Sequence, residues 1–195
     1  TLFRSDIRTA QTDPRNQRPA IPPQVPASGP YSLDATQAAA LTTTQVKALS
    51  TTQFGALNAT DMGELTTTQI AAFTNTQAQS LTSTQLGGLA DTQIQALTTT
   101  QLSSLSTTQV RNLTTDILTA LTSTQITSLT AAQISNLSTT NLNTIDATTL
   151  NAFNATQVRG LTSTQLAAFD TTTLSALDAT RYGALTATQF RSLGA

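Results

Sequence analysis

Residues 97–105 read LTTTQLSSL, and variants of this stretch fill most of the chain. A large apolar residue stands at every eighth position from Leu33 to Leu193, so that residues 34–193 divide into twenty octads close to TSTQLAAL. Repetition at a short, fixed period is typical of a solenoid, in which each unit is too small to fold alone and stacks on its neighbours. The octad therefore decides the architecture.

Octad positions 1 and 4 carry a signal for the start of a helix. Position 1 is Thr, Ser, Asn or Asp in every octad except the one that begins with Ala90, and position 4 is Gln in most. Ser or Thr followed three residues later by Gln is a capping box, in which the two residues bond each other's backbone N–H groups. The Leu before position 1 and the aliphatic residue at position 5 are the two ends of a hydrophobic staple. The chain thus starts a new helix every eight residues.

Neither a long helix nor a strand fits this spacing. Eight residues of continuous helix turn through roughly 800°, so the apolar stripe would drift by about 80° in each octad. A strand needs apolar residues at alternate positions, whereas here they are five and three residues apart. We therefore expect an all-α solenoid of about twenty short-helix repeats, each with one to one and a half helical turns. The sequence does not determine the handedness of the superhelix. It also leaves open how many octads make one coil, and two or four octads per coil are both considered.

The chain has two parts. Residues 1–32 contain all six prolines and form a basic segment, predicted to be an extended arm or linker, and residues 33–195 contain the repeats. The arm carries a net charge of about +2 and the array about −3. One interpretation is a disordered leader. The other is an arm that docks along a neighbouring subunit, with two apolar anchors, Phe3 and Ile7, and with arginines, among them Arg4 and Arg8, against the acids of the array.

The composition argues against most chemistry. The chain has no Cys and no His, which removes the commonest general base, the usual thiol nucleophile and the soft metal ligands. We expect no enzyme activity, no cofactor and no metal. Asp61 with Glu64, and Asp170 with Asp178, are the only acidic pairs considered for a cation, and helix capping explains most of these residues better. The array has five basic residues against eight acids, so nucleic acid is not an expected partner.

The ends of the array suggest self-assembly. A solenoid that stands alone usually closes with atypical polar repeats, yet the first and last octads follow the common pattern. We expect the array to continue into another copy, head to tail, or into further repeats of a longer polypeptide. A homo-oligomer or filament is the favoured assembly, and its candidate contact residues are Phe3, Arg4, Ile7, Arg8, Leu33, Phe190 and Leu193.

The stretches LTTTQVKAL at 41–49 and LTTTQLSSL at 97–105 carry a resemblance. They resemble octapeptide arrays of large secreted or surface proteins of proteobacteria, including adhesin-like ones. The resemblance implies an extracellular or cell-surface location and a spacer or adhesive role without catalytic residues. The octad at 114–121 departs from the pattern, with Ile117 in place of Gln, and is expected to mark a kink or a contact.

The sequence thus predicts a non-catalytic extracellular structural protein, a subunit of a filament or stalk assembled by end-to-end stacking. The alternative is a repeat scaffold that binds a glycan or protein ligand, and a weaker one is an ice or mineral binder that uses the many threonines. No apolar run is long enough to suggest a transmembrane segment.

Overall fold

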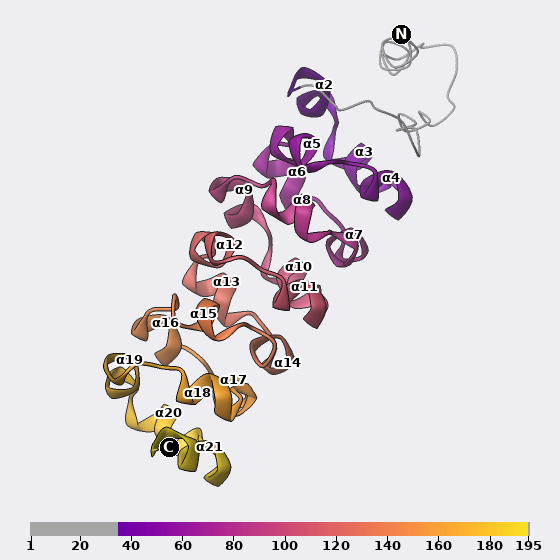
Figure 1. Cartoon of the computed structure of the whole chain (residues 1–195). Helices are drawn as coiled ribbons and strands as arrows, with labels where there is room; N and C mark the ends of the chain where they lie inside the picture. The colour runs from indigo at the N-terminus through magenta and orange to yellow at the C-terminus, as the bar shows by residue number, and fades with distance from the viewer. Residues whose placement is uncertain (1–34, 195) are drawn as a thin grey trace, which may run out of the picture.

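The computed structural model describes residues 35–194, which form an elongated stack of short helices (Figure 1). This part of the chain contains twenty α-helices of four to six residues and a final 3₁₀ turn, and no strand. The prediction of an all-α solenoid is confirmed. The elements are α2 (Ala35–Ala40), α3 (Thr43–Ala48), α4 (Thr51–Gly55), α5 (Ala59–Glu64), α6 (Thr67–Ala71), α7 (Asn75–Ser80), α8 (Ser83–Gly87), α9 (Asp91–Ala96), α10 (Thr99–Ser104), α11 (Thr107–Arg111), α12 (Thr115–Ala120), α13 (Ser123–Thr127), α14 (Ala131–Ile134), α15 (Thr139–Leu142), α16 (Ala147–Asn151), α17 (Ala155–Gly160), α18 (Ser163–Ala167), α19 (Thr171–Ala176), α20 (Ala179–Ala184), α21 (Ala187–Arg191) and η1 (Ser192–Gly194).

The helices begin where the capping boxes predict. At α10, the Thr98 hydroxyl accepts from the Gln101 N–H at 3.2 Å, and the Gln101 Oε1 accepts from the Thr98 N–H at 2.7 Å. Ala90 has no side-chain oxygen, so α9 has only half of this arrangement, in which Gln93 Oε1 accepts from the Ala90 N–H at 2.7 Å. Complete boxes form at α3, α4, α5, α6, α7, α8, α10, α11, α13, α14, α17, α18 and α21.

Each helix ends because the next apolar residue turns back into the core. Leu105 follows α10 with an extended backbone (φ −57°, ψ 140°), and its N–H donates to the Leu102 carbonyl at 3.1 Å. Ser106, the next N-cap, is also extended (φ −67°, ψ 155°). Two extended residues in succession therefore join one helix to the next. No residue in the described range has a positive φ, so the connections need no glycine.

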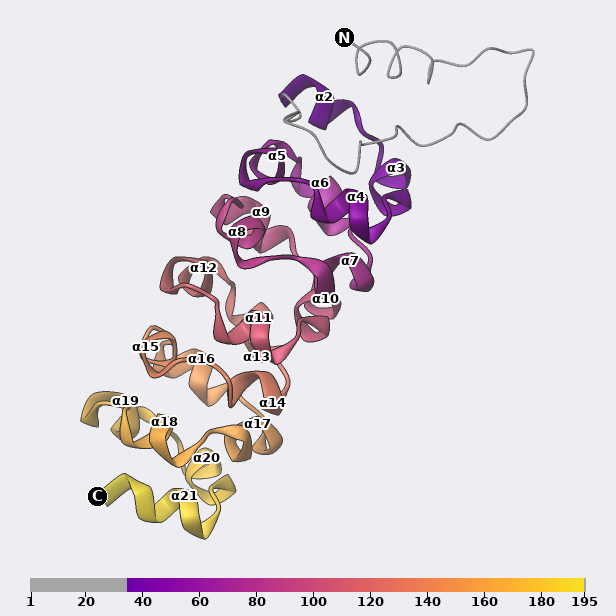
Figure 2. The same cartoon turned by 45° about the vertical axis from the view of Figure 1, so that its right-hand side comes forward.

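The helices wind into a superhelix whose coil takes more than three and fewer than four octads. Helices three octads apart are in contact, as in α7 with α10, α9 with α12 and α14 with α17. Glutamine side chains, described below, also bond across four octads. Figures 1 and 2 both place α7, α14 and α17 along one side of the stack and α9, α12 and α19 along the other. The structure thus gives the number of octads in one coil, which the sequence left open.

A single apolar core runs along the stack. It is built from octad positions 5 and 8, and the buried residues of the cluster extend from Ala38 to Ala184. Phe54 and Phe73 meet edge to face inside it, with ring centroids 4.8 Å apart. Isolated helices of four to six residues are not stable in water. Each octad therefore depends on the coils before and after it for burial.

Octad position 7 is Gly, Ala or Ser in all but four octads, which carry Glu64, Asn112, Asn136 and Thr144, and at two of its glycines the preceding coil lies directly against the backbone. A Cβ atom on Gly160 would lie 2.7 Å from the Ala131 carbonyl oxygen, and one on Gly88 would overlap the backbone of Ala59. Both contacts join octads three apart. The small residues that the sequence shows at this position are therefore a packing requirement between coils.

We predict that Gly160→Ala lowers the free energy of unfolding by about 1–3 kcal/mol, because the backbone of Ala131 would have to move. Gly87→Ala is the matched control: it lies in α8 with open space around its Cβ, and should stabilise by about 0.5 kcal/mol through helix propensity. Urea unfolding followed by circular dichroism measures both. Equal effects would contradict the close contact between coils.

Candidate functional site

Buried glutamine side chains connect each coil to the one before it. Gln101 is only 2% exposed, and while its Oε1 completes the capping box of α10, its Nε2 donates to backbone carbonyls four octads earlier. The acceptors are Ile70 at 3.2 Å and Phe73 at 2.7 Å, at the C-terminal end of α6. One amide therefore satisfies an N–H group at the start of one helix and carbonyl groups at the end of another.

The same link recurs along the stack. In each case Nε2 donates to the carbonyl of the residue 28 positions earlier in the chain, which stands at octad position 8. The glutamines that do so are Gln69, Gln77, Gln85, Gln93, Gln101, Gln109, Gln125, Gln133, Gln157, Gln165 and Gln189. The described backbone has no other hydrogen bond to those position-8 carbonyls. The link is thus the main polar contact between coils.

Reasoning from the sequence identified the capping role of these glutamines and missed their role between coils. A signal was present, because Glu serves a capping box as well as Gln does, yet position 4 is never Glu in any octad. A carboxylate only accepts hydrogen bonds, whereas an amide also donates. Gln stands at position 4 in fourteen of the twenty octads, and Asp61 is the one carboxylate there. The preference for Gln reflects this need for a donor.

Two octads keep the link with another donor. Asn141, one carbon shorter than Gln, donates from Nδ2 to the Leu113 carbonyl at 2.8 Å but no longer completes a capping box. Arg181 donates from Nε to the Phe153 carbonyl at 3.1 Å and forms an ion pair with its own N-cap, Asp178, at 2.9 Å. Different side chains at position 4 thus preserve the same bond.

From Thr66 on, where the structure describes the acceptor 28 residues earlier, three octads lack the link. Position 4 is Ile117, Thr149 or Thr173, and none of these side chains donates to a carbonyl of the preceding coil. Ile117 instead joins the apolar core, with 6% exposure. Its helix, α12, keeps the Thr114 cap and contacts both α9 and α15. The octad at 114–121 therefore keeps its place in the stack. Its departure from the pattern replaces the amide link of Gln by the burial of Ile117 in the apolar core.

A second set of bonds lies on the outside of the coils. Side chains at position 6 reach position 7 of the octad three further on. Arg159 Nε donates to the Ala184 carbonyl at 3.2 Å, and Arg111 Nη2 donates to Asn136 Oδ1 at 2.7 Å. Asn143 and Asn151 donate to the carbonyls of Ala168 and Ala176 at 3.1 and 2.8 Å. These bonds run forward along the chain, whereas the glutamine links run backward.

Three of the four acidic residues considered for a cation take part in helix capping, and the fourth, Glu64, is the last residue of α5. Asp170 and Asp178 accept from the backbone N–H groups of Thr173 and Arg181, at 2.6 and 2.8 Å. Asp61, 2% exposed, takes the place of Gln and accepts from the Asn58 N–H at 2.9 Å. Within residues 35–194, no three acidic side chains cluster as a metal site would require.

Capping also sets the acidity of two of these groups. The backbone N–H of Thr149 holds the pKa of Asp146 below its ordinary value, and the backbone N–H of Thr173 does the same to the pKa of Asp170. A carboxylate with a lowered pKa stabilises the folded state above its unfolded pKa of about 4, and this contribution is lost as the pH falls below that value and through the lowered folded pKa.

We therefore predict that the melting temperature falls between pH 5.5 and pH 2.5, and that it falls less in the double variant Asp146→Asn, Asp170→Asn. Asn is as good an N-cap as Asp and does not titrate, so the two proteins should be close in stability at pH 5.5. Thermal unfolding across this pH range measures the difference. Parallel curves for the two proteins would show that these caps contribute nothing to the acid sensitivity.

The dual role of the glutamines leads to an ordered set of mutational effects. We predict that Gln101→Ala costs about 2–3 kcal/mol, because it removes a cap and leaves the buried Phe73 carbonyl without a donor. Thr98→Ala should cost about 1 kcal/mol, since only the cap is lost. Ser103→Ala, outside the capping box, should cost almost nothing. Urea unfolding measures all three, and equal costs for Gln101 and Thr98 would contradict the link between coils.

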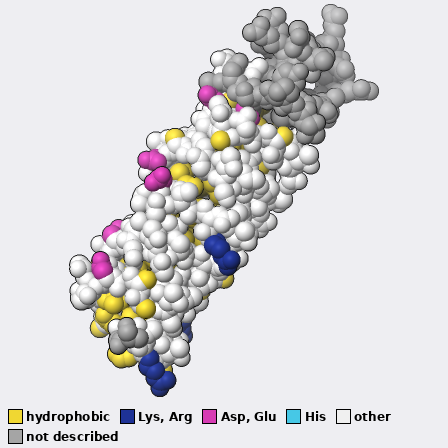
Figure 3. Space-filling view, viewed as in Figure 1, with side chains coloured by type: hydrophobic (Ala, Val, Ile, Leu, Met, Phe, Trp, Pro, Cys, Tyr) yellow, Lys and Arg dark blue, Asp and Glu magenta, His cyan; other side chains and the backbone are white. Residues whose placement is uncertain are grey.

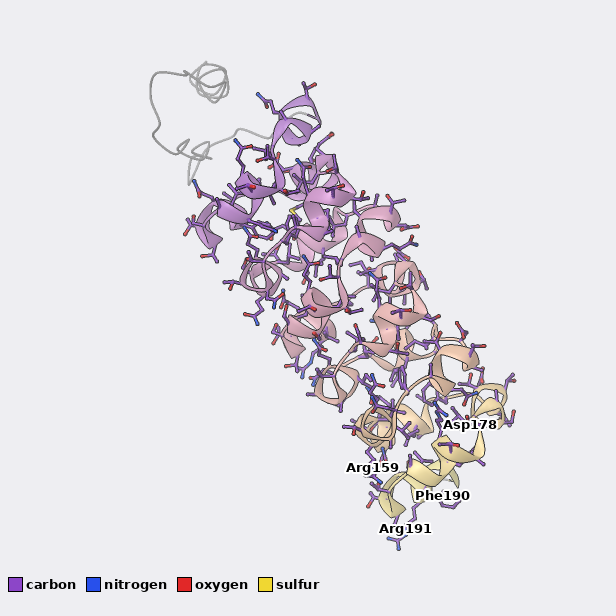
Figure 4. The ribbon with its side chains drawn as sticks, turned by 180° about the vertical axis from the view of Figure 1, so that it is seen from behind. Arg159, Asp178, Phe190 and Arg191 are labelled. Atoms are coloured by element: carbon purple, nitrogen blue, oxygen red, sulfur yellow. The ribbon has the colours of Figure 1, made fainter. Side chains whose placement is uncertain are left out.

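The last coil presents an apolar surface. Leu174, Leu177, Leu185 and Leu193 are only partly buried against the core, and Phe190 is 60% exposed. Phe190 occupies octad position 5, which is buried from Ala38 to Leu166, as in Phe54 at 0% and Leu166 at 0%, and half-buried at Leu174 and Tyr182. In Figure 3 apolar side chains gather at the end of the stack that carries α19 to α21. Figure 4 shows Phe190 and Arg191 on the outer side of α21.

The candidate assembly residues divide into two groups. Phe190 and Leu193 belong to the apolar surface just described. The Phe190 side chain is exposed, and the Leu193 side chain is partly buried against the core. The structure therefore brings these two together on one surface. The other five candidates, Phe3, Arg4, Ile7, Arg8 and Leu33, lie outside the described residues, as does the arm of residues 1–32.

A small pocket lies between α17 and α20. Phe153, Val158 and Ala184 line it, and its one charged side chain is Arg181, which is already engaged by Asp178 and the Phe153 carbonyl. None of the helices described is long and apolar enough to cross a membrane. Comparisons of the chain with family models, with curated proteins and with solved structures found no match.

Proposed function

We propose that this chain is a non-catalytic structural protein that serves as a subunit of a filament or stalk, outside the cell or at a bacterial surface. Its coils stack within the chain, and the same kind of stacking joins one molecule to the next, end to end. The resemblance to octapeptide arrays of secreted and surface proteins supports this location, and an adhesive role belongs to the same proposal.

The observation that carries the proposal is the exposure of Phe190. At the same octad position, side chains inside the stack are buried because the following coil covers them, whereas Phe190 is 60% exposed. Burying it would remove apolar surface from water, at roughly 25 cal/mol for each Å². Together with the partly buried leucines around it, Phe190 forms an apolar surface, and such a surface favours contact with another coil.

The experiment is negative-stain electron microscopy of the purified chain across a concentration series, with light scattering to measure mass. We expect rods that lengthen with concentration and show a fixed axial repeat. Phe190→Lys should shorten them while leaving the melting temperature nearly unchanged, since the side chain is exposed. Thr107→Lys, an exposed change inside the stack, is the control. Isolated short rods at every concentration would overturn the proposal.

A second candidate is a scaffold that binds a glycan or protein along its side. It is favoured by the exposed hydroxyl groups at octad positions 2 and 3, such as Thr99, Thr100, Thr107 and Thr108, which repeat in every coil. A scaffold would stay monomeric and bind its ligand in proportion to the number of coils. Glycan-array binding by isolated short rods would favour this function over the filament.

A further inference from the structure

Between α5 and α19, an acidic side chain recurs once in each coil. These residues are Glu64 in α5, Asp91 in α9, Asp116 in α12, and the N-caps Asp146 of α16 and Asp170 of α19. Successive members are alternately four and three octads apart. Because one coil takes more than three and fewer than four octads, this alternation keeps the acids on one side of the stack. We call these five residues the acidic column.

Contacts between the helices confirm this alignment. Gln93 of α9 donates to the Leu65 carbonyl at the end of α5, and α9 contacts α12, which contacts α15 just before α16. Asn151 of α16 donates to the Ala176 carbonyl at the end of α19 at 2.8 Å. Four of the five carboxylates are exposed, and the fifth is half-buried. Figure 3 shows acidic side chains, in magenta, along one edge of the stack.

The basic side chains lie on the other side. Lys47, Arg111, Arg159 and Arg191 all stand at octad position 6 and are exposed. Glutamine links join α3 to α7, α7 to α11 and α17 to α21, and α14 contacts both α11 and α17. Figures 1 and 2 place α7, α14 and α17 away from α9, α12 and α19. We call these four basic residues the basic column.

The octads of the acidic column also depart from the common pattern in a second way. Each lacks either the Gln at position 4 or the side-chain cap at position 1, and the residues found there are Asp61, Ala90, Ile117, Thr149 and Thr173. Elsewhere in residues 35–194, only Asn141 and Arg181 replace the Gln, and both keep the link between coils. The five octads therefore form a face that differs from the rest of the stack.

We propose that two stacks associate side by side, with the acidic column of one copy against the basic column of a second copy. The spacing of the two columns matches, because Lys47 and Arg159 are fourteen octads apart, as are Glu64 and Asp170. Arg111 and Asp116 lie between these pairs in their columns. A second copy thus supplies three bases at about the spacing of three acids, and this complementarity favours it as the partner.

Many copies are needed for this contact to be stable. An exposed ion pair contributes little by itself, and salt screens it. The inference rests on the proposed function, because a filament of many copies sums these weak pairs along its length. It adds lateral association to end-to-end assembly: filaments gather into bundles, and salt disperses the bundles into single filaments.

The test moves charges without changing their number. The variant Asp91→Asn, Asp116→Asn, Thr107→Asp, Thr156→Asp takes two carboxylates from the acidic column and places them at the same octad positions in two octads of the basic column. All four positions are exposed and lie in the first turn of a helix. The matched control, Asp91→Glu, Asp116→Glu, keeps the acidic column charged. Circular dichroism and thermal unfolding establish that both variants are folded.

The measurement is negative-stain electron microscopy of fibre width and length at two salt concentrations. We expect fibres of the wild type and of the control to form bundles at about 20 mM salt and to separate at about 500 mM. The variant with relocated charges should form fibres of the same length, with the bundled fraction at low salt reduced at least about fivefold, because carboxylates then lie on both sides.

The other outcomes separate the inference from the proposed function. Bundling of the relocated variant equal to that of the wild type, or wild-type bundles that persist at high salt, would overturn the inference. Wild-type fibres that stay single at both salt concentrations would also overturn it and leave end-to-end assembly standing. A wild type that forms no fibres at any concentration would overturn both proposals.

Discussion

The structure depends on one side chain that bonds in two directions. Each linking glutamine accepts a hydrogen bond from the first free N–H of its own helix and donates to the last free carbonyl of a helix four octads earlier, as Gln125 does with Thr122 and Leu97. Helices this short consist almost entirely of ends, and helix ends leave backbone groups unsatisfied. In a buried environment, each such group left without a partner costs about 1–3 kcal/mol. The amide solves this problem at both ends at once.

The same requirement explains other features of the octad. Position 7 is mostly small, and at Gly88 and Gly160 the coils lie so close together that there is no space for a Cβ atom. Positions 5 and 8 are apolar because their side chains form the buried core that runs along the stack. The repeat is thus a set of interlocking constraints, and a stack built from it has no intrinsic length.

Much of this arrangement could be predicted from the sequence. Thr98 and Gln101 predict the start of α10, and the five and three spacing of the apolar residues excludes longer helices and strands. The number of octads in a coil could not be predicted, because it depends on how the Gln101 amide and the carbonyls of α6 meet in space. A local pattern fixes where helices begin, and only packing fixes which helices become neighbours. For the candidate site, the exposure of Phe190 could not be predicted from the sequence, since Phe54 stands at the same octad position and is buried, and the second bond of Gln101 required the packing of the coils to be known.

The central claim is that the glutamine side chains hold the coils together through their amide protons. The most direct measurement is hydrogen exchange of the side-chain amides by nuclear magnetic resonance. Gln77, Gln85 and Gln101, which are buried and bonded, should exchange at least about a hundredfold more slowly than Gln79 and Gln95, which are exposed. Similar exchange rates for the two groups would contradict the account, because they would mean that the position-4 amides are open to water.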